Sequence, residues 1–242
     1  KVVLNDHNVP TSIVDRAVRL KCKIKRIGID YSYTVSDGLL DWNPDPSRWG
    51  AARAYADLQV PGSGDDAVLH NAAGAVAIVE SMNADLLVHK NAVRKGLANT
   101  ELFGRVQVLQ GGIERLFDVA HNPAAIANLA SFMDKRHPVR RNHAVFSMLK
   151  DKDLAEVVRL MGSRIASWHL TQLDASRAAP LQDLADVVSD HSNSEIKTWP
   201  NPLHAYKMAM QLARPGDRVV VFGSFYLVGA ILKSVLEDPL QA

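Results

Sequence analysis

Cysteine is almost missing from this sequence of 242 residues, because Cys22 is the only one and no intrachain disulfide can form. A chain without disulfides is typical of a reducing compartment. The sequence also shows neither a signal peptide nor an apolar run of 18 residues, so we expect a cytoplasmic protein. Lys and Arg (28) nearly balance Asp and Glu (26) without a basic run, which gives no reason to expect nucleic acid or a membrane as a partner.

Several catalytic motifs are missing as well. The nine histidines show no His-x-x-x-His or Cys/His spacing, so no metal site is indicated. No Gly-x-Ser-x-Gly nucleophile turn is present. Nothing matches the phosphate loop Gly-x4-Gly-Lys-Ser/Thr, since "GSGDD" at 62–66 lacks the Lys-Ser/Thr pair. The hydrophobic fraction of 47% and the charged fraction of 22% are nevertheless those of an ordinary globular protein.

The first hundred residues have an uneven pattern. "VVLN" and "KIKRIGIDYSYTV" predict strands, with a helix in "TSIVDRAVRL" between them. Residues 36–66 are rich in Gly, Pro and Asp, which predicts short strands and turns rather than a packed core. "HNAAGAVAIVESM" at 70–82 is apolar nearly all round, and such a helix is usually buried on every side.

Strand and helix patterns alternate from about residue 104. "GRVQVLQ" and "ERLFDVA" predict two adjacent strands separated by Gly111-Gly112. Three further strands are predicted in 143–149, 163–170 and 217–223, and helices in 123–135, 152–161, 180–189, 202–213 and 224–237. This alternation is typical of βαβ units and a mainly parallel sheet. We therefore expect an α/β protein with a domain boundary at 98–104.

Polar residues follow four of the predicted strands. In an open parallel sheet, ligands bind beyond the carboxyl ends of the strands, and helix N-termini at that edge favour anions. We therefore expect a site for a phosphate or carboxylate ligand. The polar residues at these strand ends are Asp118, His121, Asn122, Ser147, Lys150, Asp151, Asp174, Ser176, Arg177, Gly223 and Ser224.

Most of these residues also have a purely structural interpretation. Asn122 and Asp151 are common N-cap residues, and Gly223-Ser224 is compatible with an ordinary strand-to-helix turn. Arg177 is compatible with a solvated loop, and His121 with a core histidine bonded to a backbone carbonyl. An acid that ends an apolar strand costs free energy unless a partner is present, so Asp118 is the least easily explained by structure alone.

Five segments together resemble a known family. "LHNAAGAVA" (69–77), "GRVQVLQ" (104–110), "LFDVAHNP" (116–123), "SMLKDKDL" (147–154) and "VVVFGSFYLVGAIL" (219–232) occur in family-like order and spacing. They resemble the carboxyl-terminal half of folylpolyglutamate synthase/dihydrofolate synthase, relatives of the Mur peptidoglycan ligases. Phe103 and His70 each stand where the family has proline.

The resemblance implies an ATP-dependent ligase that adds L-glutamate to dihydropteroate or folate through an acyl phosphate, with Mg²⁺. It implies that Asn71, Arg105 and Asp118 bind ATP and that His121 is catalytic, on the phosphate and glutamate side. Ser176, Arg177 and Ser224 fall near the expected amino-acid pocket. No metal ligand is expected in this chain, because the family's metal acids lie in its amino-terminal part.

The resemblance also implies the domain organisation. Residues 1–98 correspond to part of the central ATP-binding α/β domain without its phosphate loop, and 99–242 to a Rossmann-like carboxyl-terminal ligase domain. We therefore expect a fragment that is inactive as a ligase by itself. Three other interpretations stay open: a Mur-type ligase for a peptidoglycan precursor, a binding module for a nucleotide or acidic metabolite, and an inactive partner subunit.

Overall fold

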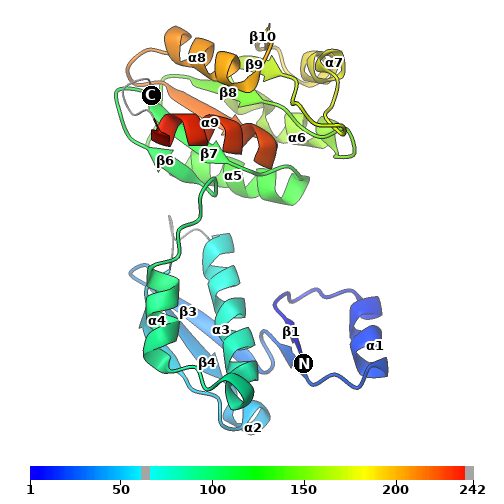
Figure 1. Ribbon diagram of the computed structural model, residues 1–242, viewed down its shortest axis with the longest axis vertical. Coiled ribbons are helices and arrows are strands. Elements are labelled where there is room, and N and C mark those ends of the chain that lie inside the picture. The colour runs from blue at the N-terminus through cyan, green and yellow to red at the C-terminus, as the bar shows by residue number, and fades with distance from the viewer. Residues whose placement is uncertain (61–65, 238–242) are drawn as a thin grey trace. The chain divides into compact units, whose positions relative to one another are not determined.

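The computed structural model describes residues 1–60 and 66–237. The chain divides into two compact units, unit 1 (Lys1–Leu102) and unit 2 (Phe103–Ala242), and each is described by itself. Figure 1 shows the elements of both units. Of the "GSGDD" stretch, residues 62–65 lie outside the described residues.

Unit 1 combines a small parallel pair of strands with a three-stranded antiparallel sheet. The parallel pair is β1 (Val2–Leu4) and β2 (Ile24–Arg26), connected by α1 (Thr11–Arg19). The antiparallel sheet has the order β3-β4-β5. Its strands and the remaining helices are β3 (Tyr31–Ser36), β4 (Leu39–Pro44), α2 (Pro46–Trp49), β5 (Tyr55–Leu58), α3 (Asp66–Leu86) and α4 (Lys90–Ala98).

The core of unit 1 lies between the antiparallel sheet and α3. Leu40 and Trp42 alternate along β4 and are fully buried, and Trp42 stacks on Tyr31 with ring centroids 5.5 Å apart. The predicted short strands are present, but the expectation of no packed core was wrong. Alternation in β4 sends every second side chain to the same face, where α3 covers it.

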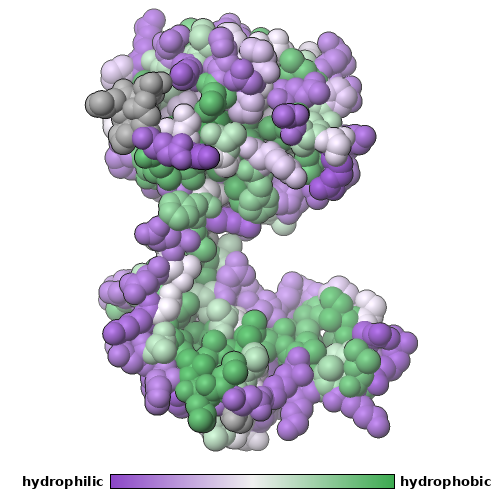
Figure 2. Space-filling view, viewed as in Figure 1, coloured by the Kyte–Doolittle hydropathy of each residue, from purple (hydrophilic) through white to green (hydrophobic). Residues whose placement is uncertain are grey.

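Two other expectations for unit 1 are corrected. The stretch "KIKRIGIDYSYTV" is two strands in different sheets, because Asp30 turns the chain by accepting a hydrogen bond from Arg26 N (2.8 Å) at Oδ2. The helix α3 is not buried on every side, since Ile78 is 49% exposed. Apolar side chains of α1 are exposed too, and Figure 2 shows apolar surface over this part of unit 1.

Unit 2 is a six-stranded sheet of order β10-β9-β8-β11-β7-β6, parallel except for β6. The mainly parallel α/β fold expected from the alternating pattern is confirmed. Its strands are β6 (Gln107–Leu109), β7 (Glu114–Asp118), β8 (Asn142–Phe146), β9 (Ser167–Thr171), β10 (Glu195–Trp199) and β11 (Arg218–Phe222). Its helices are α5 (Pro123–Lys135), α6 (Leu154–Met161), η1 (Gly162–Arg164), α7 (Leu181–His191), α8 (Pro202–Leu212) and α9 (Phe225–Glu237).

Helices cover both faces of this sheet (Figure 1). The core on one face combines apolar side chains of α5, α6 and α7, and the core on the other face those of α8 and α9. The central strand β11 is apolar after its first residue and β8 after its first two, as expected for strands buried on both faces. This arrangement leaves the two ends of the strands as the places where polar groups gather.

Local differences from the expected elements have clear causes. Asp153 caps α6 by accepting a hydrogen bond from Glu156 N (3.2 Å), so the expectation of a cap at Asp151 was wrong. The helix α4 and the strand β10 were not predicted. β10 is a half-exposed edge strand of mixed polarity, "EIKTW", which lacks the apolar signal of the central strands.

Among the described residues, no helix has the length and apolar character needed to cross a bilayer.

Candidate functional site

The carboxyl ends of four neighbouring strands meet at one edge of the unit 2 sheet. The strands β9, β8, β11 and β7 are adjacent and parallel, so the segments that follow them share one edge, here called the carboxyl edge. The sequence predicted this convergence correctly. Six of the seven predicted site residues belong to unit 2 and lie on or beside these segments: Arg105, Asp118, His121, Ser176, Arg177 and Ser224.

Asp118 ends β7 and is buried. Its Oδ1 accepts a hydrogen bond from Ala120 N (2.6 Å), and its Oδ2 accepts one from Val106 N (2.9 Å). A buried acid requires such donors, and here they come from two different loops. The carboxylate thereby fixes the turn from β7 to α5 and also the segment that precedes β6.

That second segment carries Arg105. Its backbone is unusual, because Gly104 (φ +66°) and Val106 (φ +46°) both have positive φ, which explains why β6 begins at Gln107 rather than at Gly104. A Cβ on Gly104 would lie 2.9 Å from a methyl group of Val228 in α9. Glycine therefore lets this segment pack closely on α9, while the Arg105 side chain stays exposed.

His121 is half-buried at the start of the turn into α5. Its Nδ1 lies 2.9 Å from the carbonyl oxygen of Val119. A carbonyl only accepts, so Nδ1 carries the hydrogen and Nε2 of the neutral ring has the lone pair. This is the backbone-bonded arrangement considered for a core histidine, yet it also presents Nε2 as a group that can accept a proton. Asn122 caps α5 through Ala125 N (2.9 Å), as expected.

Ser224 connects β11 to α9. Its side-chain oxygen accepts a hydrogen bond from Tyr226 N (3.0 Å) and its carbonyl accepts one from Val228 N (3.1 Å), so it caps the helix. The preceding Gly223 has φ +111°, and a Cβ there would lie 2.5 Å from the carbonyl oxygen of Ser147 in the adjacent chain segment. The turn therefore requires glycine, and the interpretation of Gly223-Ser224 as a strand-to-helix turn is correct whatever else Ser224 does.

Phe225 was not among the predicted site residues, although it contacts two of them. Its ring centroid is 5.6 Å from that of His121 and 5.5 Å from Cζ of Arg105, which lies over the ring. The only sequence signal that could have indicated this role is an aromatic residue directly after Gly223-Ser224. Arg105, Asp118, His121 and Ser224 thus form one connected group through backbone bonds and Phe225.

Ser176 and Arg177 form a separate part of the carboxyl edge. Both are exposed on the loop between β9 and α7, next to the loop that follows β8. Arg177 Nη1 is 3.4 Å from Asp151 Oδ2, and its carbonyl accepts a hydrogen bond from Lys150 N (2.9 Å). The ion pair and the backbone hydrogen bond of Arg177 are thus made with the loop after β8. Arg177 matches the interpretation of a solvated loop residue.

Asn71 lies in unit 1, exposed on α3. The helix begins at Asp66, so Asn71 is in the second turn and is not the residue that caps it. Its neighbour His70 is held in place, because Asn5 Nδ2 donates to the His70 carbonyl (2.9 Å) and Tyr33 Oη is 3.4 Å from His70 Nδ1. A histidine is therefore accommodated at this position without disturbing the helix.

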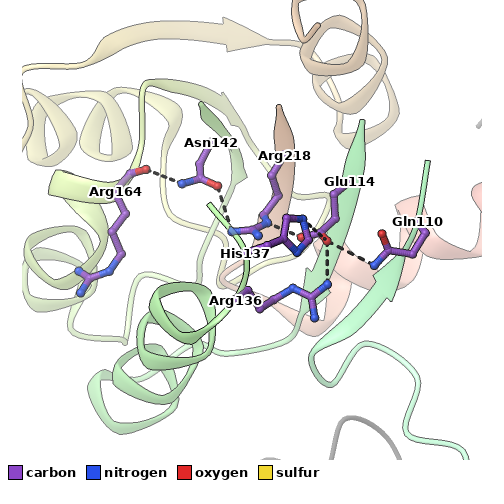
Figure 3. Close-up of polar contacts among 7 residues, drawn as sticks. All are labelled: Gln110, Glu114, Arg136, His137, Asn142, Arg164 and Arg218. Atoms are coloured by element: carbon purple, nitrogen blue, oxygen red, sulfur yellow. Dashed lines mark hydrogen bonds and ion pairs between the residues drawn. The ribbon is translucent and has the colours of Figure 1, made fainter. Parts of the chain in front are cut away.

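The opposite edge of the unit 2 sheet, here called the amino edge, contains a buried ionic network (Figure 3). Arg218 Nε and Arg136 Nη2 (2.8 Å) both donate to the carboxylate of Glu114, the first residue of β7. His137 and Gln110 also lie beside this carboxylate. Burial alone would raise the pKa of Glu114, but the hydrogen bonds from Arg136 and Arg218 hold it below its ordinary value.

A second buried network connects the strands β8, β9 and β10. Trp199 Nε1 donates to His169 Nδ1 (3.1 Å), which leaves His169 Nε2 as the donor toward Ser167 Oγ (3.3 Å). His143 then lies between Ser167 Oγ (2.8 Å) and Asp217 Oδ2 (3.4 Å). Burial lowers the pKa of His169 to about 4, with a smaller contribution from His143. This chain of bonds is complete only when His169 is neutral.

Sequence comparison shows the family to which this chain belongs. The fold is a parallel sheet covered by helices on both faces with a polar carboxyl edge, which is the architecture of ligand-binding α/β domains. The family described as "Mur ligase, glutamate ligase domain" matches residues 104–225, half of the chain, from the Arg105 segment to Phe225. The chain therefore belongs to the Mur ligase family.

Its curated relatives include dihydrofolate synthase/folylpolyglutamate synthases. The protein of this name from Escherichia coli is 28% identical over 239 residues, which cover 96% of this chain and 51% of that protein. The one from Haemophilus influenzae is 28% identical over 250 residues, with 94% and 54% covered. The chain thus spans about half the length of the curated relatives it matches.

Solved structures agree with this relationship. The structure of E. coli FolC in complex with DHPP and ADP has a TM-score of 0.81 at 28% identity and covers 98% of this chain and 53% of that chain. A bifunctional folylpolyglutamate synthase/dihydrofolate synthase with Mn, AMPPNP and L-glutamate bound has a TM-score of 0.80, also at 28% identity and with the same coverage. The resemblance identified from the sequence is confirmed.

Proposed function

We propose that this chain is part of an ATP-dependent ligase that joins glutamate to the carboxylate of dihydropteroate or a folate through an acyl phosphate. The observation that carries the proposal is the family match over 104–225, which includes every residue of the group around Phe225. The similarity to dihydrofolate synthase/folylpolyglutamate synthases over 96% of the chain supports the substrate class. The same similarity favours the folate branch over a peptidoglycan ligase and over a module that only binds a ligand.

The reaction needs donors for the phosphates, a base or acid near the reacting groups, and a pocket for glutamate. Arg105 is exposed and presents a guanidinium for phosphate oxygens. His121 offers Nε2 for proton transfer near the phosphate and glutamate. We assign Asp118 to nucleotide binding, because its carboxylate determines the shape of the two loops on the nucleotide side of the site. We assign Asn71 to the adenine side of ATP, and Ser176, Arg177 and Ser224 to the amino-acid pocket.

Magnesium belongs to this proposal, but not through the residues described. Among residues 1–60 and 66–237, no group of three or more His, Cys, Asp or Glu side chains could hold a metal ion. We therefore place the metal ligands, and the phosphate loop that the sequence lacks, in the half of the relatives' length that this chain does not span. Unit 1 would then be part of the central ATP-binding domain, and the chain would be inactive without the remaining part.

The proposal includes the setting in which the ligase works. A single cysteine in 242 residues is compatible with a reducing cytoplasm. The expected partners are small molecules, namely ATP, L-glutamate and dihydropteroate or a folate, with neither nucleic acid nor a membrane involved. The balanced charge of the chain, with a formal net charge of +2, is consistent with such partners.

A chimera tests the proposal. Residues 1–242 replace the matching half of the E. coli relative, and incorporation of labelled glutamate into dihydropteroate and folate is measured with ATP and Mg²⁺. We expect ATP-dependent product. Arg105→Ala and Asp118→Ala should each raise the ATP concentration needed for half-maximal rate by about tenfold or more, since the first removes a charge-assisted contact and the second removes the hydrogen bonds that shape both loops. A folded chimera that makes no product with any of these acceptors would contradict the proposal.

His121 has its own test in the same chimera. His121→Ala should lower kcat strongly while leaving the melting temperature nearly unchanged, because the ring makes one backbone bond and is half-buried. The matched control is His191→Gln, an exposed histidine at the end of α7. A variant that melts earlier but turns over normally would show that His121 is a structural histidine.

A further inference from the structure

Phe225 is the first residue of α9, and the residue is 55% exposed. An exposed aromatic residue needs no special explanation by itself. This ring, however, contacts two polar side chains that come from different segments: Arg105 precedes β6, and His121 follows β7. The ring of Phe225 therefore connects the two segments that carry these side chains, in addition to the hydrogen bond between His121 Nδ1 and the Val119 carbonyl.

The two contacts use complementary chemistry. The guanidinium of Arg105 lies over the ring with Cζ 5.5 Å from its centroid, within the range of a cation–π interaction. A cation–π contact uses the positive charge of the guanidinium and takes up none of its N–H groups as hydrogen-bond donors, so these stay able to donate to an anion. The His121 ring is tilted by 56° against the Phe225 ring, a usual geometry for aromatic pairs.

The position of Phe225 is itself well determined. Gly223 and the Ser224 cap fix the first turn of α9, and Gly104 packs directly against Val228 of the same helix. Asp118 fixes the segments on both sides through Val106 N and Ala120 N. The ring is thus attached to the rigid sheet, whereas Arg105 has a long and flexible side chain on a loop.

From this geometry we infer that Phe225 is a positioning residue of the proposed ligase: its ring holds Arg105 and His121 side by side at the carboxyl edge, so that the cation and the imidazole address the same bound phosphate group. This inference rests on the proposed function. Its physical basis is that two catalytic groups ordered before the substrate binds lose less conformational entropy when the substrate binds and reacts. The ring needs no contact with the substrate.

The test uses Phe225→Leu, which keeps an apolar side chain at the helix start, and Phe225→Tyr, which keeps the ring. Tyr226→Leu is the matched control, because Tyr226 is the next residue and is 57% exposed. In the chimera, Phe225→Leu should lower kcat/KM for ATP by about two- to tenfold, the range for losing weak exposed contacts. Phe225→Tyr and Tyr226→Leu should retain the rate, and all three variants should melt alike.

A double-mutant cycle separates positioning from a general structural effect. If Phe225 acts through Arg105, the loss caused by Phe225→Leu becomes smaller in an Arg105→Ala background. An equal loss in both backgrounds would overturn the inference. A kcat/KM for ATP in Phe225→Tyr as low as that in Phe225→Leu would also overturn the inference.

A second readout needs no activity. In the chain of 242 residues, the NMR signals of Arg105 Nε–H and of the His121 ring should shift in Phe225→Leu and stay in place in Tyr226→Leu. Signals that do not move would overturn the inference even if the chimera is active. An inactive chimera with the expected shifts would instead count against the proposed function while the contacts of Phe225 stand.

Discussion

The strand β7 begins with one buried carboxylate and ends with another, and the two are satisfied in different ways. Glu114 receives guanidinium groups from Arg136 and Arg218 (Figure 3). Asp118, only four residues later, receives backbone N–H groups from Val106 and Ala120. Side-chain donors at the amino edge join three parts of the fold to one another. Backbone donors at the carboxyl edge determine the shape of two loops.

The comparison shows that a buried carboxylate can stabilise the packing of the fold at one edge and determine the conformation of loops at the other. The partners of Glu114 come from β11 and from the loop after α5, so removing its carboxylate leaves buried charge. The loops shaped by Asp118 carry Arg105 and His121, so changes there should appear mainly in ligand binding. The following predictions test this contrast, beginning with the largest expected effect.

Glu114→Ala should reduce the free energy of unfolding of unit 2 by about 3–5 kcal/mol, because Arg218 is left as an uncompensated buried cation. Urea unfolding followed through the amide signals of β11 measures this in unit 2 alone. The matched control is Glu237→Ala, an exposed glutamate whose pairing with Lys233 should contribute less than about 1 kcal/mol. Equal losses in the two variants would remove the contrast between buried and exposed pairs.

Acid should destabilise unit 2 through His169. Its pKa is lowered from 6.5 to about 4 in the folded chain, so between these pH values the unfolded chain binds a proton that the folded chain does not. The free energy of unfolding therefore falls as the pH drops from about 6.5 to 4, by about 3 kcal/mol in total. Urea unfolding at a series of pH values, read from the amide signals of β9, measures this slope.

The variant His169→Gln removes the titrating group and should flatten the slope between pH 6.5 and 4. Groups nearby, namely His143, Asp217, Lys197, Glu195 and His204, remain in the variant. The exposed His191→Gln should leave the slope as it is. A slope that persists in His169→Gln would assign the acid sensitivity to another group of this network.

Ser224→Ala should have the smallest effect on stability, about 1 kcal/mol, because it removes one helix cap. It should nevertheless lower kcat/KM for ATP of the proposed ligase more than this loss of stability indicates, because the cap positions Phe225, the first residue of α9. Thermal unfolding and the ATP dependence of the chimera give the two values. A loss of stability comparable to that of Glu114→Ala would show that the carboxyl edge also serves mainly to hold the fold together.

Much of this architecture could be predicted because it depends on repeating patterns. The helix over 123–135 and its Asn122 cap are read from apolar spacing and one side chain, and parallel strands necessarily bring Asp118, Ser176 and Ser224 to one edge. Missed elements lack such patterns. The edge strand β10 is of mixed polarity, and α4 is short.

The internal geometry of the site could not be predicted from the sequence, for a different reason. The positive φ of Val106 and the two loops that Asp118 connects depend on contacts between residues distant in the chain. The contacts of Phe225 with Arg105 and His121 depend on the same loops. Residue types at a strand end therefore predict that a site exists, but not which side chains touch within it.

Gly223 has a consequence for how this protein can vary. The oxygen that blocks a side chain there belongs to the backbone of Ser147, so no change of rotamer makes room. The strands β8 and β11, which would have to separate, are neighbours in the middle of the sheet. A library with all twenty residues at position 223 should return only glycine among folded chains, whereas position 226 should accept many. During evolution, substitutions at the turn before α9 are therefore excluded, and sequence changes at the carboxyl edge are confined to the surrounding loops.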